Sequence, residues 1–495
     1  MRRLIALWAA ACLLLALAGC EEPGGDPAPE TPSPTPVATP APEPAQFALA
    51  CYPDSSFHPI IGDNRTNLAL SGLLYEGLFA LDQQFQPHEV LCQGYTASED
   101  ARTWTFTLRP GVSFSDGTPL TAAHVADSLN QARSSAAYAA RLAAVSAVRA
   151  GEGSVTVTLG APNGALPALL DIPICLGGGE RPLGTGPYVL EESPDGLFLK
   201  ARSGWWQGGS LPKDSIPLCA LRGPDELIQS FDTRSVSLVS TDLTSANALG
   251  FSSSSETIDY PTSTMIFVGF NLRQGPCREA AVRQAVQRGA DRESMATALL
   301  ARHGKPAALP AAPGSPLYAR EVAQTLDFSL SAVEAILTGG GWSRTDEGYQ
   351  QGRDLLSLAL VVCGDNAGRV SIANRLAEDL GRAGVSVEVR RLSWEAYLDA
   401  LAQGEFDLYL GEVRMTADFN PSVLMAEGGP LNYGGYADRE AQALLEQFCA
   451  SSGQGRALSA KRLYQRMAQE PPFVTLCFKN WSVLTQWRQI SGLTP

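Results

Sequence analysis

The alternation of apolar and polar residues predicts helices and strands in turn along the second half of the chain. Between residues 373 and 380, apolar residues recur at positions i, i+3, i+4 and i+7, which predicts one face of a helix, and Gly384 follows as a stop signal. Residues 385–389 then carry valine at every second position, which is typical of a strand. A helix over 394–402 and a strand over 406–410 repeat this order, so this half is predicted to be an α/β layer structure.

Strand signals dominate the first half of the folded part. Short apolar or alternating runs predict strands over 47–52, 103–108 and 154–159. A helix is predicted over 121–132, with Thr121 as its N-cap. A folded part of about 450 residues is too long for one hydrophobic core and indicates two or three domains.

The first 46 residues follow a different pattern. A cationic start and an apolar run of about 14 residues, shorter than the roughly 20 that a membrane-spanning helix needs, end in the lipobox-like sequence of residues 17–20. We therefore expect a signal peptide over 1–19 and a lipid on Cys20 that anchors the protein to the outer face of the cell membrane. A transmembrane helix and plain secretion are the weaker alternatives. The proline-rich stretch 20–46 is expected to form an extended stalk.

Composition excludes some classes of partner. The chain has 37 basic and 51 acidic residues and a net charge of −14, which argues against nucleic acid as a partner. Of the 10 cysteines, Cys12 lies in the predicted signal and Cys20 at the lipid site, and the others form no CxxC pair. The 4 histidines are scattered among them, so no metal site is predicted. Export permits disulfides, and buried free thiols are the equal alternative.

Catalytic motifs are absent from the sequence. No GxSxG, HExxH, Walker loop or helix-opening GxGxxG occurs. The glycines at 177–179 and 184–186 lack the lysine and helix of a phosphate cradle, so we interpret them as turns. The sequence predicts that the protein is not an enzyme and uses no cofactor. A secreted hydrolase and a surface adhesin stay open as remote alternatives.

Several short motifs follow one another in a fixed order. They are Tyr75-Glu76-Gly77-Leu78, the stretch 104–125 around Arg109-Pro110-Gly111, the turn 184–188, Phe270-Asn271, Val282-Arg283-Gln284-Ala285, Asp291-Arg292-Glu293, 394–398, 404–407 and Ala417-Asp418-Phe419-Asn420-Pro421. In order and spacing they resemble the peptide- and nickel-binding family of extracellular solute-binding proteins, known as family 5, from about Phe47 to Pro472.

The resemblance implies an α/β fold of two lobes, like that of periplasmic binding proteins, with the ligand in the cleft between them. The first lobe is expected to be discontinuous and to comprise residues 47–67, 184–261 and 473–495. A domain inserted into this lobe is expected over 68–183, and the second lobe over 262–472.

The resemblance also implies ligand-binding residues. In peptide-binding members, an aspartate in the segment that matches residues 417–420 pairs with the α-ammonium of the peptide, so Asp418 is the candidate for that role; a turn cap is its alternative. Trp394 matches a family position whose indole lines the pocket, and the alignment of a nearby proline places Asp63 by the cleft. Met415 lies just before the aspartate, where peptide binders carry an aromatic residue.

The predicted function follows from the resemblance. We expect a monomeric, lipid-anchored binding subunit that captures short peptides and delivers them to an ATP-binding-cassette permease. The alternative keeps the fold and changes the ligand to a metal chelate, haem, an oligosaccharide or a signalling peptide.

Overall fold

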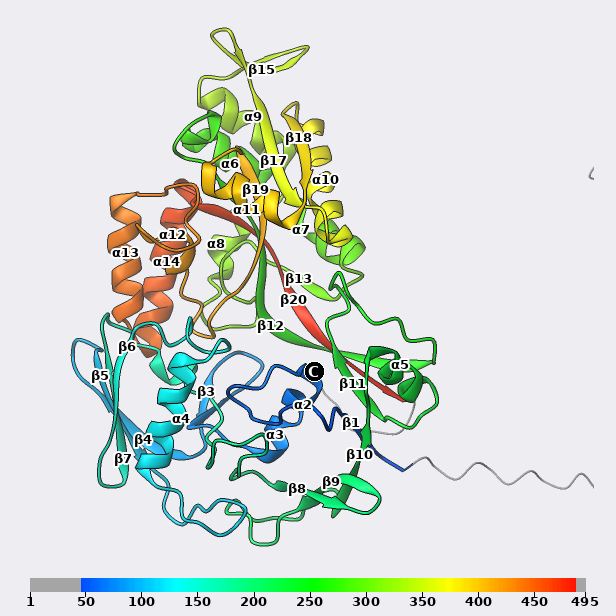
Figure 1. The fold of residues 1–495 in the computed structure, drawn as a ribbon. Helices are drawn as coiled ribbons and strands as arrows, with labels where there is room; N and C mark the ends of the chain where they lie inside the picture. The colour runs from blue at the N-terminus through cyan, green and yellow to red at the C-terminus, as the bar shows by residue number, and fades with distance from the viewer. Residues whose placement is uncertain (1–45, 487–495) are drawn as a thin grey trace, which may run out of the picture. The chain divides into compact units, whose positions relative to one another are not determined.

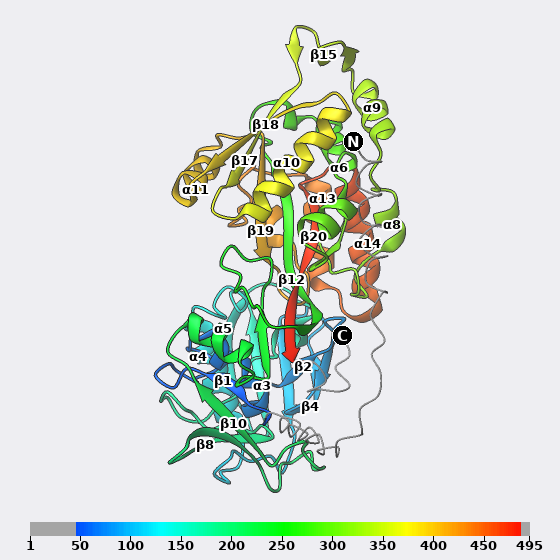
Figure 2. The ribbon, with the colours of Figure 1, turned by 90° about the vertical axis from the view of Figure 1, so that its right-hand side faces the viewer.

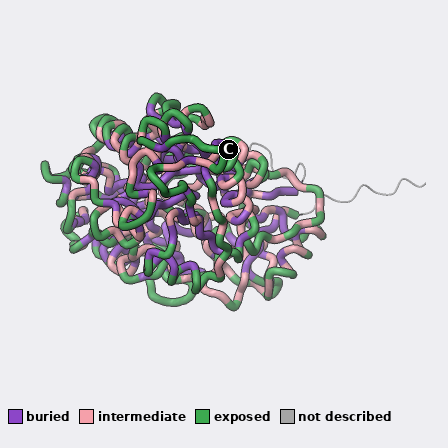
Figure 3. The backbone as a smooth tube through the Cα atoms, turned by 90° about the horizontal axis from the view of Figure 1, so that it is seen from above, coloured by how far each residue is buried: buried purple, intermediate pink, exposed green. Residues whose placement is uncertain are grey.

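The computed structural model describes residues 46–486, and its buried apolar residues divide them into two lobes (Figure 1). The first lobe is built around cores that contain Phe57 and Phe231. The second lobe is built around cores that contain Leu376 and Tyr464. Viewed from above, the buried segments lie inside exposed and half-exposed ones (Figure 3).

The first lobe contains two four-stranded sheets. One has the order β1 (Leu49–Cys51), β10 (Ser215–Ala220), β9 (Gly196–Ala201), β8 (Tyr188–Ser193). The other has the order β4 (Cys92–Ala97), β5 (Thr103–Leu108), β7 (Ser154–Leu159), β6 (Val145–Ala150). The remaining elements are α2 (Arg65–Ala69), α3 (Ser71–Leu74), β2 (Phe79–Leu81), β3 (Pro87–Glu89), α4 (Ala122–Ser134), the short helix η1 (Leu166–Leu169) and α5 (Pro224–Asp232).

A seven-stranded sheet forms the centre of the second lobe and reaches into the first, because the strand at one of its edges contributes Val239 to a core of the first lobe. Its order is β11 (Leu238–Thr241), β20 (Phe473–Gln486), β12 (Ser255–Phe270), β19 (Leu408–Arg414), β17 (Ser357–Cys363), β18 (Ser386–Leu392), with β13 (Gly304–Pro306) paired to β20. Around it lie η2 (Pro276–Arg278), α6 (Ala280–Arg288), α7 (Arg292–Ser294), η3 (Met295–Leu299), α8 (Arg320–Gln324), α9 (Leu330–Gly339), α10 (Ala367–Arg382), α11 (Trp394–Gln403), α12 (Ser422–Met425), α13 (Arg439–Ala450) and α14 (Gly453–Gln469). A small sheet of β14 (Ser343–Thr345), β15 (Gly348–Gln351) and β16 (Asp354–Leu355) completes the lobe.

The local patterns in the sequence correspond to real elements. Thr121 caps α4 by accepting from the backbone N–H of His124, and the ring Nδ1 of His124 accepts from the backbone N–H of Thr121, which makes a capping box. Helix α10 carries the predicted apolar face and is followed by Gly384 at φ +92, a conformation that favours glycine. Strand β18 then pairs in parallel with β17, as the order of helix and strand predicted.

Strands β12 and β20 run side by side from one lobe into the other (Figure 2). Their pairing is interrupted between Pro261 and Met265 by a register shift. At this point the buried Lys479 of β20 donates to Asp242 Oδ2 at 2.6 Å and to Glu412 Oε1 at 3.3 Å. Asp242 follows β11 on the side of the first lobe, and Glu412 lies on β19 of the second lobe. The ammonium group of Lys479 therefore joins the two lobes at the point where β12 and β20 pass from one to the other.

The division of the chain into domains stays a prediction. Strand β20 contributes Phe473 and Phe478 to a core of the second lobe and Leu484 to a core of the first. Strand β20 therefore contributes side chains to the cores of both lobes.

Several predictions lie outside the described residues. They concern the signal peptide over 1–19, the lipid on Cys20, the stalk as far as residue 45 and the segment 487–495. Within residues 46–486, no helix is both long enough and apolar enough to cross a membrane.

Candidate functional site

The loop after β19 places the carboxylate of Asp418 between the two lobes. Its side chain is buried, with the residue only 3% exposed. Oδ1 accepts from Thr416 Oγ1 at 2.5 Å and from the backbone N–H of Asn420 at 3.4 Å. Oδ2 accepts from Asn163 Nδ2 at 3.1 Å and lies 3.4 Å from Arg456 Nη2. A carboxylate has about four acceptor positions, so these four donors satisfy it.

Arg456 on α14 supplies the opposite charge from within the second lobe. Its guanidinium lies over the ring of Phe448, 4.0 Å from the centroid, and donates to the backbone oxygens of Phe448 and Asp418 at 2.9 Å each. A buried carboxylate is costly without such a partner, and removal of one member of the pair leaves the other charge stranded. The position of Asp418 thus depends on Arg456, which lies 38 positions away.

Asn163 reaches Asp418 from the first lobe. It lies in the loop between β7 and η1, and its Oδ1 accepts from the backbone N–H of Ala165 at 2.8 Å. This bond fixes the orientation of the amide, so its NH₂ group faces Asp418. Among residues 46–486, Asn163 is the one donor to this carboxylate that belongs to the other lobe, and 255 positions separate the two residues.

Further basic side chains lie near this carboxylate. Burial lowers the pKa of Arg141 to about 10, and the charge of Arg414 acts in the same direction, while Tyr138 and Asp418 act in the opposite direction. Arg141 belongs to the first lobe and also pairs with Asp171. Arg414 ends β19 and is exposed. The surroundings of Asp418 therefore present positive charge from both lobes.

The other predicted ligand-binding residues lie in different settings. Trp394 begins α11, is 50% exposed and stacks on Tyr397 with ring centroids 6.0 Å apart. Met415 precedes Asp418 in the same loop, but it is buried in a core of the second lobe. Asp63 is exposed just before α2. Within residues 46–486, no hydrogen bond or ion pair joins Trp394 or Asp63 to Asp418, so their roles stay predictions.

The motif residue Glu76 holds the first lobe together. Its carboxylate accepts from Trp206 Nε1 at 2.7 Å, Thr185 Oγ1 at 2.8 Å and Gln207 Nε2 at 2.9 Å. Burial raises the pKa of Glu76, and these hydrogen bonds act in the opposite direction. The motifs at 75–78 and 184–188 therefore meet in space as structural partners.

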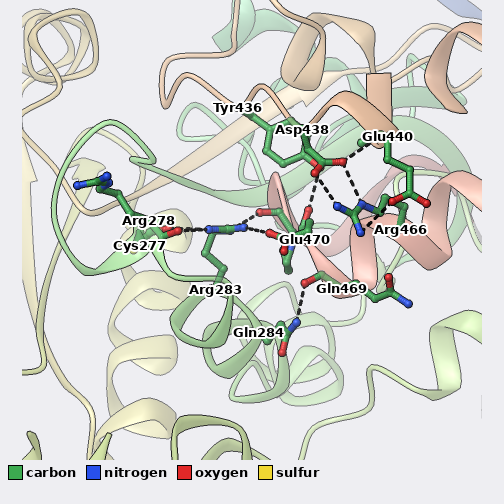
Figure 4. Close-up of polar contacts among 12 residues, drawn as sticks. Cys277, Arg278, Arg283, Gln284, Tyr436, Asp438, Glu440, Arg466, Gln469 and Glu470 are labelled. Carbon is green, nitrogen blue, oxygen red and sulfur yellow. Dashed lines mark hydrogen bonds and ion pairs between the residues drawn. The ribbon is translucent and has the colours of Figure 1, made fainter. Parts of the chain in front are cut away.

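The motif residue Arg283 has the same kind of role in the second lobe (Figure 4). It is buried at the start of α6, donates to Pro471 O and Cys277 O at 2.9 Å each, and pairs with Glu470 Oε2 at 2.5 Å. Nearby, Arg466 pairs with Asp438 at 2.6 Å. These contacts join α6, α13 and α14. Of the predicted ligand-binding residues within 46–486, Asp418 is the one with a hydrogen bond across the two lobes.

The described part of the chain contains free cysteines and no cluster of metal-ligating side chains. Residues 46–486 contain no group of three or more His, Cys, Asp or Glu side chains arranged to hold a metal ion. The cysteines within these residues are free thiols, so of the two alternatives the structure has buried or partly buried thiols and not disulfides.

Comparison with known proteins gives a family match. The model of "Bacterial extracellular solute-binding proteins, family 5 Middle" matches residues 86–428. The glutathione-binding protein GsiB of Salmonella typhi is 28% identical over 275 residues, which are 51% of this chain and 53% of GsiB. Protein XP55 of Streptomyces lividans is 28% identical over 379 residues, 72% of this chain and 68% of that protein. The chain thus spans about half the length of GsiB, the first of these relatives.

Solved structures show the same fold. A nickel ABC transporter protein from Bacillus halodurans superposes with a TM-score of 0.72 at 19% identity, over 90% of this chain and 96% of that chain. NikA from Brucella suis in complex with Fe(III)-EDTA gives 0.68 at 19%, over 91% and 96%. The oligopeptide-binding protein AppA from Bacillus subtilis in complex with a nonapeptide gives 0.59 at 18%, over 91% and 96%. The predicted two-lobed α/β fold is confirmed.

Proposed function

The chain belongs to the family 5 extracellular solute-binding proteins, which are binding subunits of ATP-binding-cassette importers and not enzymes, and from this premise we propose that it captures short peptides between its lobes. The proposal includes delivery of the peptide to a permease by a monomer that is anchored through a lipid on Cys20.

A carboxylate buried between the lobes carries this proposal. Asp418 accepts from both lobes, and Asn163 is its donor from the first lobe. An α-ammonium group brings three donors and a full charge, so it forms a stronger bond to a buried carboxylate than a neutral amide does. We therefore infer that the ammonium of a bound peptide takes the place of Asn163 at Oδ2, while Thr416 and Arg456 stay bonded to Asp418.

Two of the similar proteins support a peptide as the ligand. One is named for binding glutathione, and another was solved with a nonapeptide. The main chain of a peptide offers donors and acceptors along its whole length, so a cleft can hold it without reading each side chain.

A metal chelate is the second candidate ligand. NikA of Brucella suis was solved with Fe(III)-EDTA, a ligand rich in carboxylates. Arg141 lies close enough to Arg414 and Asp418 for their charges to affect its pKa, and guanidinium groups such as those of Arg141 and Arg414 are suited to carboxylates. The described residues offer no metal-ligand cluster, so such a metal would arrive already held by its chelator.

The test is calorimetry of the purified mature protein with two sets of ligands. One set contains di- to pentapeptides with free amino ends, and the other contains Fe(III)-EDTA and Ni²⁺ with histidine. We expect heat of binding from the peptides and tighter binding of free-amino peptides than of their N-acetylated forms. Binding of the chelates without binding of any peptide would replace the first proposal by the second.

A further inference from the structure

The two lobes meet along a narrow seam near α13 (Figure 1). The seam comprises Phe85, Asn163 and Gly164 of the first lobe with Asp418, Phe419, Cys449, Ala450 and Ser451 of the second. Its contacts are the rings of Phe85 and Phe419 at 5.0 Å, the bond from Asn163 to Asp418 at 3.1 Å, and the bond from Gly164 N to Cys449 O at 2.7 Å. On the side of the second lobe the seam rests on β20, because the ring of Phe419 also packs on that of Phe478 at 5.8 Å.

The two aromatic residues of the seam have strained backbones. Phe85 has φ 63 and Phe419 has φ 49, in the left-handed region that bulky residues rarely adopt. Phe419 is fully buried, and Phe85 packs against a core of the second lobe although it belongs to the first. Such backbone strain persists where surrounding contacts hold the residue in place. Here the side-chain rings of the two strained residues contact each other across the seam.

Gly164 leaves no room for a side chain at the point where the lobes approach. A Cβ atom at this position would lie 2.1 Å from Ser451 O and 2.8 Å from Ala450 O. Both are backbone atoms of the second lobe, so neither can move aside as a flexible side chain would. The φ angle of Gly164 lies outside the left-handed region, so alanine suits its own backbone and the conflict arises only with the other lobe.

We propose that the seam is a closing latch, which forms when the lobes close and separates when they open, with Gly164 and Phe85 as its positioning residues. This inference rests on the proposed capture of a ligand between the lobes. The apparent affinity of a two-state binding protein is its intrinsic affinity multiplied by the fraction of molecules that are closed. The Phe85–Phe419 contact and the Gly164–Cys449 bond act on this fraction for all ligands alike, whereas the Asn163–Asp418 bond gives way to a ligand that brings an ammonium group.

Gly164→Ala tests the latch, and Gly160→Ala is the matched control. Gly160 lies in the same lobe just before the seam, and a Cβ there would meet Ala144 O at an ordinary 3.8 Å. Spectroscopic labels are introduced at Asp195 of the first lobe and Arg353 of the second, both exposed, through unnatural amino acids because the native cysteines exclude thiol labelling. Distances between the labels, binding by calorimetry and unfolding temperature are measured for each variant.

For Gly164→Ala we expect longer label distances without ligand, and affinity that falls about tenfold or more for free-amino and N-acetylated peptides alike. The unfolding temperature should stay close to that of the wild type, because the conflict is absent when the lobes are open. Gly160→Ala should match the wild type in all three measurements.

Three results would overturn the latch: unchanged distances, unchanged affinity, or a loss restricted to free-amino peptides. A wild-type protein that binds no peptide would remove the proposed function, and the label distances would still decide whether Gly164 controls closure.

Discussion

Asp418→Asn tests the proposed recognition of an ammonium group. The change keeps the shape of the side chain and removes its charge. An ammonium that has lost its buried counter-charge costs about 3 to 5 kcal/mol, and each 1.4 kcal/mol is a factor of ten in affinity. Binding of a free-amino peptide should therefore weaken by about two to three orders of magnitude. An N-acetylated peptide carries no ammonium group and should lose much less.

The same substitution also affects the folded protein, because Arg456 loses its carboxylate partner. Arg456 keeps its bonds to the backbone oxygens of Phe448 and Asp418, so the loss of stability should lie at the low end of the range, at about 3 kcal/mol. Asp438→Asn is the matched control, since Asp438 pairs with Arg466 at 2.6 Å in the same lobe and makes no contact in the seam. The control should lower stability and leave binding unchanged.

The measurements are calorimetry with both peptides on the wild type and the two variants, and urea unfolding of each protein. A free-amino peptide that binds Asp418→Asn as tightly as the wild type refutes the proposed role of the carboxylate. An equal loss for both peptides also refutes it, because Asp418 would then act through the fold or through lobe closure and not through charge.

Three other predictions address the Lys479 ion pairs between the lobes, the response to pH and the anchor. Lys479→Met should lower the free energy of unfolding by about 3 to 5 kcal/mol in urea, and the further changes Asp242→Asn and Glu412→Gln should restore part of it, since they remove the stranded carboxylates. Burial lowers the pKa of His58 from its ordinary 6.5. The neutral imidazole therefore contributes fully to stability above pH 6.5, and this contribution is lost as the pH falls below that value. Thermal unfolding of His58→Phe should depend less on pH in this range. A palmitate analogue should label the wild-type protein in cells and not Cys20→Ala, and an unlabelled wild type would contradict the anchor.

The spacing of apolar residues was enough to predict those helices and strands whose sequence signals lie within a few residues of one another. Helix α10 and strand β18 follow from apolar spacing and a terminal glycine, because the period of a helix or strand is set by its own backbone. The order of the short motifs predicted the two-lobed fold, which is confirmed. In the structure, Glu76 and Arg283 from these motifs bond to other parts of their own lobes.

The surroundings of Asp418 could not be predicted in this way. Its partners Asn163 and Arg456 lie 255 and 38 positions away, and each belongs to a type of residue that is common on protein surfaces. No local period or short motif relates them to Asp418. The strained backbones of Phe85 and Phe419 also carry no signal in the sequence, because phenylalanine rarely adopts that conformation and tertiary contacts impose it.

The position of β20 has a consequence for the order in which the protein can be made. This strand is the last element of the described chain, yet it lies between β11 and β12 and completes cores in both lobes. Until a ribosome has produced Phe473–Gln486, both neighbouring strands keep an unpaired edge. Neither lobe can finish folding ahead of the other during synthesis, so an unfinished chain stays accessible to chaperones, export machinery and proteases until β20 has been added.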